Sequence, residues 1–169
     1  ANRKLFALYE QSLAGGWGFG SIRPVHRLSE QIVGVVGYGQ IGRAVAKRVA
    51  ALGMNVIYYD PYISADEIAR KVTLNELLRD SDYVTLHLPL NDQTKSLLGA
   101  QALSRMKQTA VVINAARGEV IDANALADAL MEGRIGGAFL DVLASEPPRD
   151  DDPLVKAGAI LTGHSAWYS

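Results

Sequence analysis

Short apolar runs recur along the sequence, and segments with helical spacing separate them. The first run, Ile32–Val36, is continuously apolar, which is typical of a parallel strand covered on both faces. Further runs lie at 55–59, 83–88, 110–114 and 137–140, with a short last one at 160–161. Strands that alternate with helices form right-handed βαβ units. We therefore predict an α/β fold: a doubly wound parallel sheet of about six to seven strands with helices on both faces.

The predicted helices lie between these runs. They span 3–14, 41–52, 97–106 and the segments that Asn75 and Asp122 would cap, through Leu78 and Met131 respectively. Glycines within 15–20 free the backbone and end the first helix. Ser145–Pro153, rich in proline and aspartate, is predicted to be a loop.

Composition excludes several classes of protein. The 169 residues include 17 Lys+Arg and 18 Asp+Glu, a net charge of −1 that attracts neither nucleic acid nor an anionic membrane. No apolar run approaches the ~20 residues that cross a bilayer. Cysteine is absent, which excludes disulfides and thiolate chemistry and leads us to expect a reducing, cytoplasmic environment. With three histidines far apart in the sequence, a metal site has no support.

Residues 37–42 form a Gly-x-Gly-x-x-Gly element. The element follows the first apolar run, precedes a predicted helix and lies ~20 positions before Asp60, the context of a dinucleotide-binding turn. A glycine-rich turn without a ligand is the alternative. The context favours a Rossmann-type sheet that binds a dinucleotide.

Each position of this element has a chemical reason. Gly37 permits the tight turn, Gly39 lets the backbone approach a pyrophosphate, and Gly42 lets helix and strand pack closely. The backbone amides of Gln40 and Ile41, at the start of the helix, would then face the phosphates.

Asp60 ends the second apolar run, where a carboxylate accepts hydrogen bonds from the adenosine ribose hydroxyls. A 2′-phosphate would meet like charge there, and no Arg or Lys occupies 61–65 to receive it. The sequence therefore favours NAD over NADP. The alternative is that Asp60 only starts the Asp60-Pro61 turn.

Three later segments narrow the function: Met106–Gly118, Gly137–Val142 with Ser145–Pro147, and Thr162–His164. Together with residues 37–42 and 87–90, they closely resemble the NAD-binding domain of the D-isomer-specific 2-hydroxyacid dehydrogenases. Within that family, His164–Ser169 is most similar to the branch related to the C-terminal-binding-protein co-repressors.

The resemblance implies hydride transfer between NAD(H) and a D-2-hydroxy acid/2-oxo acid pair, with three catalytic side chains. Arg117 would grip the substrate carboxylate and polarise its carbonyl. His164 would exchange the proton of the carbonyl oxygen, because an imidazole pKa of about 6.5 leaves both forms accessible near neutrality. Glu146 would orient the ring by bonding its other nitrogen. Taken singly, the alternatives are a surface ion pair, a solvated loop glutamate and a solvent-facing histidine.

The resemblance also implies further cofactor contacts. Besides the glycine turn and Asp60, they are Leu88, Pro89, Thr94, Ala115, Ala116, Arg117, Asp141 and His164. The segment 88–94 would pass the adenosine and ribose, and Ala115-Ala116 would lie beneath the nicotinamide. Asp141 would receive the nicotinamide carboxamide, although an aspartate at a strand end also caps turns.

Two positions depart from the family pattern. Gly163 stands where the family usually has proline, which frees the backbone before the histidine. Trp167 replaces the small residues that many dehydrogenases have there, and its ring would narrow the pocket, face an aromatic substrate or lie at an interface.

The resemblance divides the chain into a linking helix and glycine-rich loop at 1–22, an NAD-binding domain at 23–162 and the start of a return to a substrate domain at 163–169. The sequence lacks an initiator methionine, and we expect a piece of a longer protein that binds NAD but does not turn over a 2-oxo acid alone. The first helix, with Trp17 and Phe19, resembles the family's dimer arm, so we expect a homodimer. The competing function is a dinucleotide-gated, co-repressor-like binding protein with marginal catalysis.

Overall fold

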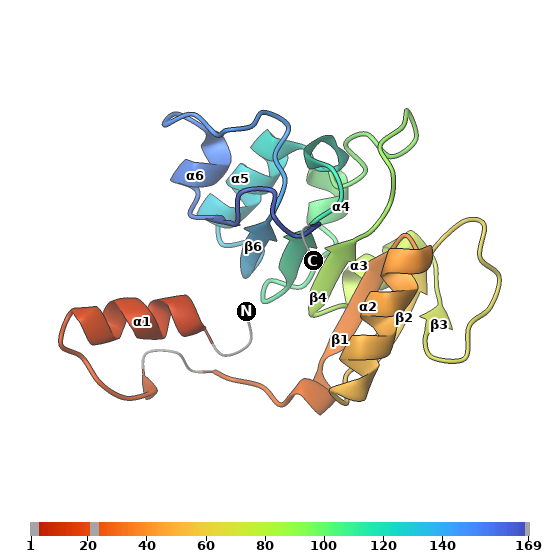
Figure 1. Ribbon diagram of the computed structural model, residues 1–169, viewed down its shortest axis with the longest axis horizontal. Coiled ribbons are helices and arrows are strands. Elements are labelled where there is room, and N and C mark those ends of the chain that lie inside the picture. The colour runs from red at the N-terminus through yellow and green to blue at the C-terminus, as the bar shows by residue number, and fades with distance from the viewer. Residues whose placement is uncertain (1–3, 21–23, 168–169) are drawn as a thin grey trace.

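A seven-stranded, all-parallel sheet forms the centre of the computed structural model, which describes residues 4–20 and 24–167 (Figure 1). The strands are β1 (Ile32–Val36), β2 (Asn55–Tyr59), β3 (Arg70–Lys71), β4 (Tyr83–Leu86), β5 (Val111–Asn114), β6 (Gly137–Leu140) and β7 (Ile160–Leu161). Their spatial order is β3-β2-β1-β4-β5-β6-β7. The chain adds β2 and β3 on one side of β1 and then returns to add β4 to β7 on the other side, so the strand order switches between β1 and β4. The predicted doubly wound parallel sheet is confirmed.

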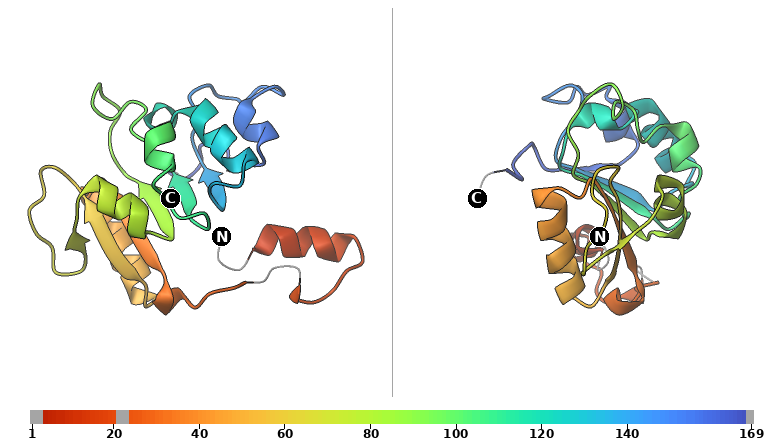
Figure 2. Two further views of the ribbon diagram at one scale, coloured as in Figure 1. Left: turned by 180° about the vertical axis from the view of Figure 1, so that it is seen from behind. Right: turned by 90° about the vertical axis from the view of Figure 1, so that its right-hand side faces the viewer.

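Helices cover both faces of this sheet, as predicted. They are α2 (Gln40–Ala51), α3 (Leu74–Asp80), α4 (Ala100–Leu103), α5 (Ala123–Met131) and α6 (Pro153–Lys156). A further helix, α1 (Leu5–Leu13), precedes the sheet in the chain. In the edge-on view of Figure 2, α2 lies on one side of the sheet and α3, α4 and α5 lie on the other. The α2 side also carries the C-terminal end of the chain.

The apolar runs are continuous because successive side chains of one strand enter two different cores. Val35 of β1 points to the α2 side and belongs to a cluster with Ala46 and Tyr58. Val36, the next residue, belongs to the larger cluster on the opposite side, with Leu77 of α3 among its members. A strand buried on both faces must be apolar at every position, which is why Ile32–Val36 was recognisable.

Helix α1 lies apart from this sheet (Figure 1) and buries none of its residues. Its large apolar side chains Leu5, Phe6, Tyr9 and Leu13 are all more than half exposed, and Trp17, which follows it, is 92% exposed. Of the helices in the described part of the chain, none has the length and apolar character needed to cross a bilayer.

The start of α3 corrects the sequence prediction. Thr73, rather than Asn75, is the N-cap: its side chain accepts a hydrogen bond from the backbone N–H of Glu76, and the Glu76 carboxylate accepts one from the backbone N–H of Thr73. This reciprocal arrangement satisfies amides that the helix itself leaves free. Asn75 was the wrong choice because the Thr-x-x-Glu spacing is the stronger signal. The predicted Asp122 cap of α5 is confirmed.

Other boundaries also differ. The predicted helix 97–106 contains only the single regular turn of α4, and the strand predicted at 83–88 ends at Leu86. Strand β3 was not predicted, because its two residues have exposed side chains and form no apolar run. Helix α6, which Asp152 caps at the end of the predicted Ser145–Pro153 loop, was not predicted either.

Replacing the N-cap of α3 tests this correction. We expect Thr73→Ala to lower the free energy of unfolding by about 1 kcal/mol, because the backbone N–H of Glu76 loses its acceptor. Asn75→Ala, at an exposed position in the first turn of the same helix, should leave it unchanged or slightly raise it. Urea denaturation measures both, and equal losses would contradict the assignment of the cap.

Candidate functional site

The residues predicted to form a site lie along one edge of the sheet. In spatial order across the sheet, Asp60 follows β2, Gly37 follows β1, Leu88 comes after β4, Ala115 follows β5 and Asp141 follows β6. Parallel strands bring their carboxyl ends to the same edge, and from β2 to β6 this row spans four strand spacings, roughly 19 Å. The row crosses the β1–β4 switch point, where open α/β sheets place their ligands.

The glycine turn is pressed between β4 and α2. Gly37 has a φ of 86°, and a Cβ there would overlap the carbonyl group of His87. A Cβ at Gly42 would overlap the carbonyl oxygen of Gly37. Side chains at these positions would push the turn away from the strand end and the helix away from the turn.

The start of α2 is open to a ligand. A Cβ added at Gly39, the N-cap of α2, would have no atom within 4 Å, and no side chain caps the helix. The first amides of an α-helix, here those of Gln40 and Ile41, have no partner inside it and attract anions. The geometry fits a pyrophosphate, which would occupy the space that a side chain at Gly39 would fill.

Asp60 organises the loop after β2. Its Oδ2 accepts the backbone N–H of Tyr38 at 2.8 Å, and its Oδ1 accepts those of Tyr62 and Ile63 at 2.8 and 3.2 Å. Burial alone would raise the pKa of Asp60, but these three hydrogen bonds outweigh it and hold the pKa below its ordinary value. The turn-forming role weighed for Asp60 is therefore present, and Oδ2 keeps acceptor capacity for a hydroxyl group.

The segment after β4 makes a compact loop beside the glycine turn. The Thr94 hydroxyl donates to the carbonyl of Pro89 at 2.7 Å and accepts the backbone N–H of Asn91 at 2.8 Å. His87 Nε2 lies 2.9 Å from Thr85 Oγ1, and burial lowers the pKa of His87 to about 4. His87 is thus a neutral, packed residue at the end of the strand near pH 7.

Asn114, the last residue of β5, shapes the loop that carries Arg117. Its buried side chain donates to the carbonyl of Arg117 at 2.9 Å and accepts the backbone N–H of Ala116 at 3.0 Å. The exposed guanidinium of Arg117 turns back and donates to the carbonyl of Ala116 at 2.6 Å. The sequence signal for this loop is an asparagine that ends an apolar strand, and the shape of the loop was not predicted from it.

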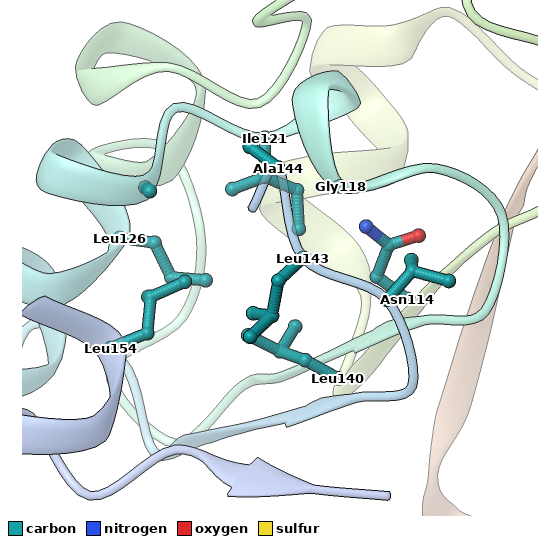
Figure 3. A pocket seen from close by; sticks show the side chains of 10 residues that line it. Asn114, Gly118, Ile121, Leu126, Leu140, Leu143, Ala144 and Leu154 are labelled. Atoms are coloured by element: carbon teal, nitrogen blue, oxygen red, sulfur yellow. The ribbon is translucent and has the colours of Figure 1, made fainter. Parts of the chain in front are cut away.

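A glycine brings the Arg117 loop against the loop after β6. A Cβ at Gly118 would overlap the backbone of Leu143 and Ala144, so only glycine permits this contact. Figure 3 shows Gly118 beside these two residues. The three residues line a small cavity together with the apolar side chains of Leu126 and Leu154. That cavity measures about 10 Å³, at the lower limit for a single water molecule. The loops carrying Arg117 and Glu146 are therefore packed directly together.

Glu146 and His164 form the central pair of the site. His164 Nδ1 lies 2.7 Å from Glu146 Oε2, with the two side chains 44% and 36% exposed. The other carboxylate oxygen accepts the backbone N–H of Leu143 at 2.8 Å. This N–H is the main cause that holds the pKa of Glu146 below its usual value, and the bond from His164 adds to it. The bond to Nδ1 orients the ring and does not involve Nε2.

Asp141 anchors the loop that carries His164. Its carboxylate accepts the Thr162 hydroxyl at 2.6 Å and the backbone N–H groups of Ser165 and Ala166 at 3.0 and 2.9 Å. Its carbonyl accepts the backbone N–H of His164 at 2.6 Å. Burial alone would raise the pKa of Asp141, but these hydrogen bonds to the carboxylate hold it below the ordinary value.

The His164 loop has an unusual backbone. Gly163 and His164 both have positive φ, 68° and 54°. Proline fixes φ near −65°, so the family's usual proline could not adopt this conformation at position 163. The Trp167 indole N–H donates to the carbonyl of His164 at 2.8 Å, and its side chain is 72% exposed.

A hollow of about 390 Å³ opens beside the pair. Asp141, Glu146 and His164 contribute its polar lining, while Pro147 and Leu161 contribute apolar surface. The guanidinium of Arg117 lies outside this lining, with its hydrogen bond to the Ala116 carbonyl. Within residues 4–20 and 24–167, no group of three or more histidines or carboxylates could hold a metal ion.

The anchoring role of Asp141 can be tested by its pH dependence. We expect Asp141→Asn to lower the free energy of unfolding at pH 7 by about 1 kcal/mol, because an amide cannot accept all three hydrogen bonds. A carboxylate with a depressed folded pKa stabilises above its unfolded pKa, so this difference should shrink as the pH falls below about 4. Urea titrations across pH measure it, with the exposed Asp128→Asn as control. A difference that is constant with pH would contradict the role.

Residues 1–166 match the family described as D-isomer specific 2-hydroxyacid dehydrogenase, NAD binding domain. Glycerate dehydrogenase of Methylorubrum extorquens is 43% identical over 149 residues, which cover 86% of this chain and 46% of that protein. The chain thus spans about half the length of the curated relatives it matches.

Solved structures agree with the sequence match. A D-isomer specific 2-hydroxyacid dehydrogenase from Lactobacillus delbrueckii ssp. bulgaricus, in its NAD-complexed form, has a TM-score of 0.90 at 33% identity, over 99% of this chain and 56% of that chain. An acyclic imino acid reductase in complex with NADPH and D-Arg has a TM-score of 0.91 at 35% identity, over 99% and 54%. The chain therefore belongs to the family of NAD-binding domains of D-isomer-specific 2-hydroxyacid dehydrogenases.

Proposed function

We propose that this chain is the cofactor domain of an NAD-dependent oxidoreductase that interconverts a D-2-hydroxy acid and a 2-oxo acid. The observation that carries the proposal is the Glu146–His164 pair at the same sheet edge as the open turn before α2. When bound, NAD supplies the position that accepts or donates the hydride. The glycerate dehydrogenase and glyoxylate reductase among the relatives support a small 2-hydroxy/2-oxo acid as substrate.

The proposed cofactor site uses the whole row of residues. The amides of Gln40 and Ile41, with Gly39, would hold the pyrophosphate, and Asp60 would accept the ribose hydroxyls. The remaining proposed contacts are Gly37, Gly42, Leu88, Pro89, Thr94, Ala115, Ala116, Arg117, Asp141 and His164. For Asp141 the proposed bond to the nicotinamide carboxamide would add to the hydrogen bonds by which it anchors the histidine loop.

Charge favours NAD over NADP. The Asp60 carboxylate would repel a 2′-phosphate, and the nearby amides of Tyr38, Tyr62 and Ile63 are already bonded to it. The structural relative solved with NADPH shows that the same fold accommodates the other cofactor, so this proposal depends on the residues at this position.

The proposed chemistry uses three side chains. His164 would pass a proton between Nε2 and the substrate oxygen, while Glu146 holds Nδ1 and orients the ring. Arg117 would bind the substrate carboxylate through its planar fork, which requires the guanidinium to leave the Ala116 carbonyl. These exposed groups would need a second surface to exclude water. We propose that residues 23–162 form the cofactor domain, and that 163–169 lead to a substrate domain that provides this surface.

We also propose that the chain forms a homodimer through 1–22, in which exposed apolar side chains such as Leu5 and Leu13 would be covered. The second candidate function is a co-repressor-like protein in which NAD promotes this dimer and catalysis is marginal. It is favoured by the similarity of His164–Ser169 to that branch of the family. Trp167 supports it, because an exposed indole suits an interface.

Cofactor titration tests the first part of the proposal. By isothermal titration calorimetry, the chain should bind NADH more tightly than NADPH, and Asp60→Ala should weaken NADH binding about tenfold through loss of a charged hydrogen-bond acceptor. Glu67→Ala, an exposed carboxylate on the same loop, is the matched control. Tighter binding of NADPH by the unaltered chain would overturn the assignment.

Turnover tests the second part. In a protein that joins this chain to a substrate domain, NADH oxidation by a panel of 2-oxo acids should fall about 10²- to 10⁴-fold in His164→Ala, which removes the acid/base group. His26→Ala, which alters a histidine before β1, should leave it unchanged. No turnover in the unaltered protein, together with a dimer by light scattering only when NAD is present, would instead favour the co-repressor-like function.

A further inference from the structure

The middle residue of the glycine turn, Tyr38, is completely buried. Its ring stacks on Tyr58 with centroids 3.8 Å apart, and the Arg43 guanidinium carbon lies 5.7 Å from the Tyr38 ring centre. The turn itself requires only glycines on either side of this position. The packing accounts for the ring of Tyr38, and the contacts of its hydroxyl group account for the choice of tyrosine.

The Tyr38 hydroxyl bonds the far end of the loop that follows β2. It donates to Asp66 Oδ1 at 2.9 Å, and the same oxygen accepts the backbone N–H groups of Ile68 and Ala69 at 2.8 and 3.3 Å. The Ile68 bond is the largest cause that lowers the pKa of Asp66, and the Tyr38 hydroxyl contributes to the same shift. The hydroxyl thus donates to an ionised carboxylate, the stronger class of hydrogen bond.

The backbone of Tyr38 bonds the near end of the same loop. Its N–H donates to Asp60 Oδ2, while Asp60 Oδ1 holds the amides of Tyr62 and Ile63. Both ends of the loop 60–69 are therefore hydrogen-bonded to Tyr38, one residue of the glycine turn. Between these two ends, Tyr62 is 84% exposed, while Ile63 packs against the cluster that contains Tyr38 and Tyr58.

We propose that Tyr38 is a positioning residue that sets where the Asp60 carboxylate stands relative to the phosphate-binding turn. The inference rests on the proposed NAD binding, in which Asp60 and the Gln40 amide contact the same ligand. Two groups that must engage one rigid ligand bind it best when their separation is fixed beforehand. The hydroxyl–Asp66 bond supplies that restraint on the loop.

The variant Tyr38→Phe removes this bond alone and keeps the stacked ring. We expect NADH binding, measured by calorimetry, to weaken about five- to tenfold, as one charge-assisted hydrogen bond no longer restrains the loop. Tyr58→Phe is the matched control, because the buried Tyr58 hydroxyl has no hydrogen-bond partner in the part of the chain that the structure describes. It should leave NADH binding unchanged.

Two further readouts separate positioning from a general loss of stability. Without cofactor, amide hydrogen exchange at Tyr62 and Ile63 should accelerate in Tyr38→Phe but not in Tyr58→Phe. In a double-mutant cycle, Tyr38→Phe should have little effect on NADH binding in the Asp60→Ala background, because both act through the same contact.

The outcomes are distinct. Unchanged NADH binding in Tyr38→Phe, or strictly additive losses in the cycle, would overturn the positioning role and leave the proposed function standing. Absence of NADH binding by the unaltered chain would overturn the proposed function, and this inference with it.

Discussion

Parallel strand pairing is the constraint on which every feature of the site depends. Because all seven strands run the same way, each loop that follows a strand emerges at one edge, and residues from Gly37 to His164 lie along it. The strand order switches between β1 and β4, and the glycine turn that follows β1 lies at this switch point. Glycines then decide how closely neighbouring loops approach, at Gly37 against β4 and at Gly118 against Leu143. An antiparallel strand at any of these positions would send its loop to the opposite edge.

Carboxylates at this edge have two tasks at once. Asp60 and Asp141 each accept three hydrogen bonds from N–H or O–H groups of neighbouring loops, which lowers their pKa and fixes those loops. The same side chains are proposed to meet the two ends of the cofactor, the ribose and the nicotinamide amide. Structural and binding roles are compatible here because a carboxylate has about four acceptor sites. The turn-forming alternatives weighed for both residues are therefore real features of the fold.

Much of this arrangement could be predicted from the sequence. Ile32–Val36 identified the central strand because a doubly covered strand is apolar throughout, and Asp122 identified a helix start. The two-residue β3 has no apolar signal, and the orientation of the Arg117 guanidinium depends on the shape of its loop. The Tyr38–Asp66 bond joins positions 28 residues apart through a loop without periodicity. Such tertiary contacts leave no local pattern to detect.

In the proposed function, one ligand spans the edge from the glycine turn to the Glu146–His164 pair. Backbone NMR of the chain titrated with NADH measures this most directly, because each amide reports its own surroundings. Shifts at Gly39, Gln40 and Ile41 should follow one saturation curve with shifts at Ala115, Ala116 and His164. Shifts confined to one end of the row, or saturating at different NADH concentrations at the two ends, would contradict it.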